Sequence, residues 1–119
     1  MATLANQGVA SQASFGQLGS AFIDGAVSYT APAGKVVVAM TFLEDTKFTV
    51  LTPEATGDCF GLATGSGQGT GNEVVVSTTV FPKGLTVYGR WTNFTPDAAA
   101  SNGGVIVYLG PAKSPVSTP

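Results

Sequence analysis

Histidine is absent from this 119-residue sequence, and charged side chains make up only 10% of it. The chain therefore lacks the side chain most often used as a general base near neutral pH and as a transition-metal ligand. Five basic and seven acidic residues give a formal net charge of −2. Because binding to phosphates requires a surplus of positive charge, we expect no nucleic-acid partner.

The single cysteine, Cys59, cannot form a disulfide within the chain. Folding then does not depend on an oxidising compartment, which favours folding inside a cell. Beside Phe60, the Cys59 thiol is expected to act as a small buried hydrophobic group. Residues 1–20 have neither a charged n-region nor a continuous apolar stretch, so we expect no signal peptide. The apolar runs are also too short to cross a membrane, and no membrane partner is expected.

The residues that could support catalysis or metal binding form no recognisable arrangement. The acidic residues are scattered over predicted turns without the pairing of a glycosidase. A calcium site at Asp24 or Asp58 would need the spaced oxygen ligands of an EF-hand loop, which the sequence lacks. The glycine-rich stretch 65–71 lacks phosphate-loop spacing and is interpreted as a flexible loop. We therefore expect no catalytic residue, no metal, no cofactor and no enzymatic activity.

Segments rich in β-branched and apolar residues recur about every ten residues, with turn residues between them. The run 35–43 is apolar on both faces, which indicates a strand buried on both sides. This pattern, without a helical period, predicts one all-β domain, a β-sandwich or jelly roll. The predicted strands are 26–30, 35–43, 47–51, 59–63, 73–81, 85–94 and 103–109.

The predicted core consists of alternate residues in four of these segments: 36–42, 74–80, 85–91 and 105–109. Two of the strands follow similar turn sequences, Pro32–Lys35 and Pro82–Leu85. In each, proline presets the turn and glycine supplies the permissive backbone position. Two explanations of this similarity stay open. The turns could be corresponding corners of the fold, or the same favourable turn sequence could occur twice by chance.

The chain is predicted to divide into an extended N-terminal arm (1–20), the β-sandwich domain (21–111) and an extended C-terminal tail (112–119). The arm is rich in Ala, Ser, Gln and Gly, and its apolar residues are too few to fold alone. Their spacing suits docking on a neighbouring molecule, although a plain flexible leader would have the same composition. The expected docking residues are Leu4, Val9, Phe15 and Leu18.

The aromatic and basic residues near position 90 form the most functional-looking patch. In a strand, Tyr88 and Arg90 share one face while Trp91 points to the other. These three residue types are favoured anchors of interfaces. We interpret Trp91 as a core residue and Tyr88 and Arg90 as candidate interface residues.

Three stretches of the sequence resemble small virion structural proteins of tailed bacteriophages, especially marine and cyanobacterial phages. They are Thr30–Lys35 leading into VVVAMTFLED, FPKGLTVYGRWTNFTP (Phe81–Pro96) and GGVIVYLGP (Gly103–Pro111). The resemblance covers most of residues 25–111 and includes no catalytic signature. It implies a β-sandwich or jelly-roll module, often trimeric, located on the capsid as a decoration (cement) protein or on tails and fibres.

The resemblance leads us to expect a capsid decoration protein, made in the host cytoplasm, that binds and stabilises the outer shell. Its expected partners are the major capsid protein lattice and itself, as a homotrimer. Three alternatives stay open. The protein could be a tail, neck or fibre component, or a module that binds host glycans through a patch around Tyr88 and Trp91. It could also be a bacterial β-sandwich domain of no viral origin.

Overall fold

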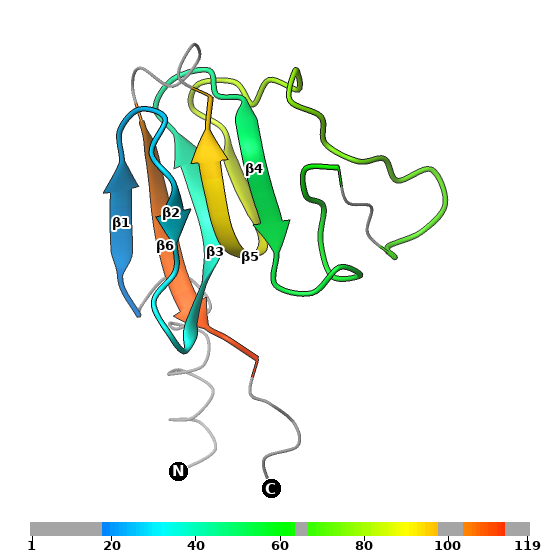
Figure 1. The fold of residues 1–119 in the computed structure, drawn as a ribbon, viewed down its shortest axis with the longest axis horizontal. Helices are drawn as coiled ribbons and strands as arrows, with labels where there is room; N and C mark the ends of the chain where they lie inside the picture. The colour runs from blue at the N-terminus through cyan, green and yellow to red at the C-terminus, as the bar shows by residue number, and fades with distance from the viewer. Residues whose placement is uncertain (1–17, 64–66, 98–103, 114–119) are drawn as a thin grey trace, which may run out of the picture.

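Six antiparallel strands form one curled sheet in the computed structural model, which describes residues 18–63, 67–97 and 104–113 (Figure 1). The described residues contain no helix, and hence none that could cross a membrane. The predicted all-β class is confirmed. The strands are β1 (Ser20–Ile23), β2 (Tyr29–Thr30), β3 (Lys35–Phe42), β4 (Phe48–Pro53), β5 (Thr86–Pro96) and β6 (Val105–Pro111).

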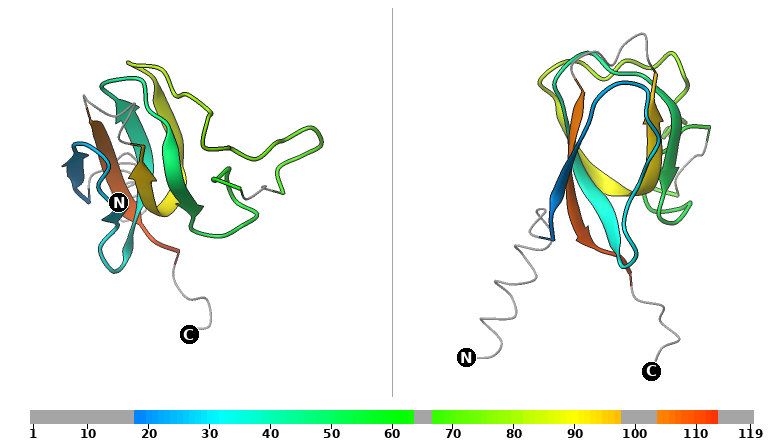
Figure 2. Two further views of the ribbon diagram at one scale, coloured as in Figure 1. Left: turned by 45° about the horizontal axis from the view of Figure 1, so that its top comes forward. Right: turned by 60° about the vertical axis from the view of Figure 1, so that its left-hand side comes forward.

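The curl of the sheet comes from β5, which pairs with three different strands. The strand order is β1-β6-β3-β5-β2, and β4 also pairs with β5. The first half of β5 lies beside β3, with Val87 opposite Met40. Its second half lies between β2 and β4, so that Phe94 is opposite both Tyr29 and Leu51. Because one strand serves both halves, the sheet bends around its interior, as both views in Figure 2 show.

Strand β3 lies in the middle of the sheet, between β5 and β6. Residues Val36 to Met40 are all buried, as the apolar run predicted. An extra residue in β3, Val38, shifts the register with β6 between Val37 and Ala39. Such a bulge changes which alternate residues face the core. Val37 precedes it and faces the core, and Met40 and Phe42 follow it and do so too.

The core contains residues from both halves of the curled sheet and from the segment between β4 and β5. Trp91 is fully buried, which confirms its interpretation as a core residue. Its indole Nε1 donates a hydrogen bond to the Phe60 carbonyl at 2.9 Å. The core residues are Ile23, Val37, Met40, Phe42, Phe48, Leu51, Val75, Phe81, Trp91, Phe94, Val105, Val107 and Leu109.

The predictions of strands at 59–63 and 73–81 are wrong, because these stretches make only isolated bridges. Leu62 bridges Val75, and Phe81 bridges Thr46. β-branched side chains suit a β-sheet. They do not by themselves provide the neighbouring strand with which such a segment must pair. A turn closed by the Thr79 N–H to the Val76 carbonyl, at 2.9 Å, bends the chain here.

The core prediction for 74–80 is also wrong in most of its length. Of these seven residues only Val75 is buried, and it packs in the core together with Phe81. Val74, Val76 and Val80 are exposed instead. The β-branched residues of this segment therefore suggested a buried strand, but most of them are exposed to solvent.

Strand β1 was not predicted, because it is short and follows the low-complexity arm. Ser20 pairs with Tyr108 of β6, and the Leu109 N–H donates to the Gly19 carbonyl at 2.8 Å. The Leu18 carbonyl accepts a hydrogen bond from Lys35 Nζ at 3.0 Å. The other three expected docking residues, Leu4, Val9 and Phe15, lie outside the described residues.

The two similar turn sequences adopt the same geometry. The Lys35 N–H donates to the Pro32 carbonyl at 3.0 Å, and the Leu85 N–H donates to the Pro82 carbonyl at 3.1 Å. The third residue of each turn is a glycine with positive φ, 81° at Gly34 and 85° at Gly84. A positive φ at this position characterises a type II turn, which explains the glycine in both sequences.

Candidate functional site

The side of β1, β6, β3 and β5 that faces away from the core is named here the outer face. Val105, Val107 and Leu109 of β6 point into the core, so the residues between them point outward. Cross-strand pairing then aligns two rows of outward residues, and none of the eight is charged. The rows are Ser20, Tyr108, Ala39 and Tyr88, and Phe22, Ile106, Thr41 and Thr86.

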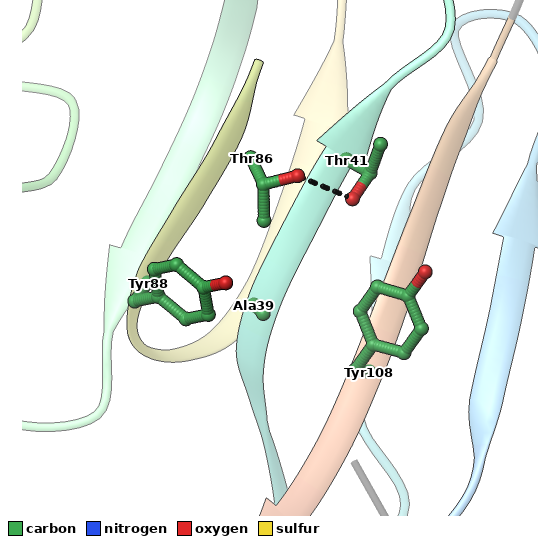
Figure 3. Close-up of a pocket in the computed structure, with 5 residues that line it drawn as sticks. All are labelled: Ala39, Thr41, Thr86, Tyr88 and Tyr108. Atoms are coloured by element: carbon green, nitrogen blue, oxygen red, sulfur yellow. Dashed lines mark hydrogen bonds between the residues drawn. The ribbon is translucent and has the colours of Figure 1, made fainter. Parts of the chain in front are cut away.

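A hollow of about 290 Å³ lies on the outer face across β5, β3 and β6 (Figure 3). Ala39 forms its floor and is 4% exposed. The rings of Tyr88 and Tyr108 stand on either side of Ala39. Thr41 and Thr86 line one end, where their hydroxyl oxygens are 2.8 Å apart in a hydrogen bond.

The bulge in β3 places the floor of the hollow on the outer face. Without it, strict alternation from Val37 would turn Ala39 toward the core. With the extra residue, Ala39 pairs with Tyr88 on one side and Tyr108 on the other. Thr41 follows two residues later and faces Thr86.

The two predicted interface residues of β5 have different surroundings. Tyr88 is 66% exposed and lines the hollow. The Arg90 side chain is instead bound to other residues of the chain. Its Nε lies 2.6 Å from Glu54 Oε1, and its Nη2 donates a hydrogen bond to the Pro111 carbonyl at 2.7 Å. Trp91 is fully buried and offers no surface to a glycan. The open alternative of a glycan-binding patch around Tyr88 and Trp91 therefore cannot include Trp91.

Glu54 joins the chain after β4 to the residues that follow β6. In addition to Arg90, its carboxylate accepts a hydrogen bond from the Lys113 N–H at 2.7 Å. Burial raises the pKa of this carboxyl, but the hydrogen bonds and positive charges of Arg90 and Lys113 outweigh burial, so the pKa is lowered. The Lys113 ammonium also forms an ion pair with Asp58. These contacts fasten Lys113 to the segment that follows β4.

Cys59 is half-buried beside β5. The Arg90 N–H donates to its sulfur at 3.4 Å, and the thiol lies 3.4 Å from the Arg90 carbonyl. Burial raises the pKa of the Cys59 thiol. Within residues 18–63, 67–97 and 104–113, no three His, Cys, Asp or Glu side chains are grouped as a metal site. This includes the surroundings of Asp24 and Asp58.

Sequence reasoning missed most of the hollow. Tyr108 could have been found, because the alternation in 103–109 places it opposite the core valines. Its position across β3 from Tyr88 depends on the strand order and on the bulge, and neither has a signal in the sequence.

Comparisons with protein-family models, with curated proteins and with solved structures find no match for this chain. The candidate site is therefore described by what its own side chains offer. These are two aromatic rings, two threonine hydroxyls and a surface without charge.

Proposed function

We propose that this protein is a structural component of a bacteriophage particle, a decoration protein that binds the outer shell of the capsid and stabilises it. The main support is the segment 73–81, named here the valine segment. Its residues Val74, Val76 and Val80 are 41%, 47% and 51% exposed. Exposed apolar side chains that follow one another closely in the chain favour burial against a partner.

The valine segment is fixed to the core at two points. Phe81 exchanges backbone hydrogen bonds with Thr46, at 2.8 and 2.9 Å. The Val75 N–H donates to the Gly61 carbonyl at 3.2 Å, and the Val75 side chain is in the core. These anchors hold the exposed valines in place before a partner arrives. Preorganisation of this kind lowers the entropic cost of association.

Burial of this segment suits a partner that is present in many copies. A standard interface buries about 800 Å² on each partner, and repetition over a lattice adds these contacts together. The expected partners are the major capsid protein lattice and two further copies of the chain in a homotrimer. The low charge of the chain agrees with such contacts, because charged residues are depleted at interface cores.

The resemblance of most of residues 25–111 to phage virion proteins supports the same proposal. It favours a particle surface as the location and the host cytoplasm as the place of synthesis. A role in the tail, neck or fibre is the related alternative, and it differs in the number of copies on each particle.

The test is addition of the purified protein to phage shells that lack it, followed by reconstruction of the particles from micrographs. Wild-type protein is expected on the shell in hundreds of copies. Val76→Asp should keep its melting temperature and lose binding, because a charge enters the contact. Val27→Asp, on the exposed connection between β1 and β2, is the matched control and should still bind. Absence of the protein from shells and virions would contradict the proposal, and a few dozen copies would place it on the tail or fibres.

A further inference from the structure

We propose that the hollow between Tyr88 and Tyr108 binds a neutral saccharide, a function beyond attachment to the particle and independent of it. The geometry begins with Ala39, which is the cross-strand partner of both tyrosines. Their Cα atoms are therefore two strand spacings apart, about 9–10 Å. Figure 3 shows the two rings on either side of the small alanine side chain, which leaves the floor between them open.

The lining of the hollow has the chemistry of a sugar site. A sugar ring presents C–H groups on its faces and hydroxyls around its rim. The faces of Tyr88 and Tyr108 carry the negative part of the aromatic quadrupole, which attracts such C–H groups. The hydroxyls of Thr41 and Thr86 hydrogen-bond to each other, which leaves one O–H group to donate and lone pairs on both oxygens to accept hydrogen bonds from sugar hydroxyls.

The absence of charge from the two rows selects the class of saccharide. None of the eight residues in the two rows is charged. A sialylated, sulfated or phosphorylated glycan would lose hydration without gaining a cationic partner among these eight residues. A neutral glycan has no such cost, so the hollow favours hexose or N-acetylhexosamine units.

The size of the hollow fits a short stretch of a longer glycan. Its volume of about 290 Å³ is near the lower end of the range for ligand sites, which suits one or two sugar rings. Phe22 and Ile106 continue the uncharged surface beside it, and Phe22 is 59% exposed. Further rings of the same glycan can lie along this row.

The position of the hollow makes it accessible when the protein is attached through the valine segment. The valine segment packs in the core through Val75 and Phe81, and none of its residues lines the hollow. The hollow lies on the outer face of the sheet and shares no residue with the valine segment. One copy can thus bind a partner through one set of residues and a glycan through another.

The experiment is titration of the isotope-labelled full chain with maltohexaose, cellohexaose and chitohexaose, with sialyllactose as the charged comparison, followed by NMR. At least one neutral probe is expected to bind at millimolar concentration and to shift the signals of Ala39, Thr41 and Tyr108. Tyr88→Ala should weaken this binding by roughly tenfold or more, since one ring is lost. Tyr88→Phe keeps the ring and should retain most of the affinity. The matched control, Val27→Ala, removes an exposed apolar side chain elsewhere and should bind like the wild type.

Three results would overturn the inference. The first is that no neutral probe binds, and the second is that sialyllactose binds more tightly than the neutral probes. The third is that Tyr88→Ala leaves binding unchanged or instead dissociates an oligomer in sedimentation, which would mean that a second copy covers the outer face. None of these results bears on binding to shells through Val76, so the two proposals can fail separately.

Discussion

The Trp91 indole lies directly over Gly89, two residues earlier in the same strand. A Cβ atom added to Gly89 would meet Trp91 Cη2 at 2.5 Å and Cζ2 at 2.6 Å. The pair occurs where two residues of β5, Gly89 and Arg90, stand opposite the single residue Val38 of β3. Glycine at this position lets the largest core side chain fold back along its own strand.

The first prediction is that Gly89→Ala destabilises the protein by about 1–3 kcal/mol, because the buried indole must move to accept a methyl group. Gly57→Ala is the matched control, since a Cβ there has nothing within 4 Å. It should change the free energy of unfolding by less than about 0.5 kcal/mol. Urea denaturation of both variants measures the difference, and equal midpoints would contradict the packing of Trp91 on Gly89.

The second prediction compares one substitution in two environments. Val107 is fully buried in β6, whereas Val76 is 47% exposed on the valine segment. Val107→Asp buries an unpaired charge and should cost about 4 kcal/mol or more, enough to unfold a small domain. Val76→Asp should melt within a few degrees of the wild type. A cooperatively folded Val107→Asp protein would refute the assignment of β6 to the core.

The burial of Val38 extends this prediction to β3, where Val38→Asp is also expected to prevent folding. Val38 is buried, although it is not one of the core-cluster residues. A soluble Val38→Asp variant with a cooperative melt would show that a charge is tolerated at the bulge.

The third prediction concerns acid stability. The pKa of Glu54 is lowered in the folded state, so the folded protein binds fewer protons at this site than the unfolded chain. Its contribution to stability is therefore complete above the ordinary carboxyl value of 4.5 and is lost as the pH falls through the lowered pKa. Glu54→Gln should lower the melting temperature at neutral pH, and its difference from the wild type should fade in acid.

Glu73→Gln is the control for the acid experiment, because Glu73 occupies an exposed position on the valine segment. It should leave the melting temperature nearly unchanged at every pH. A Glu54→Gln curve that runs parallel to that of the wild type would show that the Arg90 and Lys113 contacts do not stabilise the charged carboxylate.

The fourth prediction is that Cys59 reacts slowly with thiol reagents in the native protein. Its raised pKa leaves less of the nucleophilic thiolate at a given pH, and its partial burial restricts access. Rates measured with a chromogenic disulfide at mildly alkaline pH should rise by an order of magnitude or more in urea. Equal rates in native and unfolded protein would mean that the loop around Cys59 opens freely.

The long strands could be predicted from the sequence because their side chains alone indicate burial. The apolar run of β3 predicted a strand covered on both sides, and Met40 and Val36 are indeed buried. The stretch Val74–Val76 carries the same signal and forms no strand. The difference is the presence of a neighbour, since β3 has β5 and β6 beside it while the valine segment has only isolated bridges.

The candidate site was only partly predictable for a related reason. Tyr88 was identified from its residue type and its place in a strand. Ala39 and Tyr108 complete the hollow through a register that includes the bulge at Val38. A bulge changes the face of every residue after it, so strict alternation fails from Val38 onward.

The strand order has a consequence for how the chain folds during synthesis. β3 lies between β5 and β6, and β1 pairs only with β6 among the described residues. When residues 20–53 leave the ribosome, all four of their strands (β1, β2, β3 and β4) lack the partners against which they will pair, because these partners are β5 and β6. Loop closure over such long separations slows folding and leaves apolar strands uncovered for longer. The sheet can therefore be completed only after residue 111 has emerged, and a nascent chain arrested before β6 should be captured by chaperones while the finished chain is released.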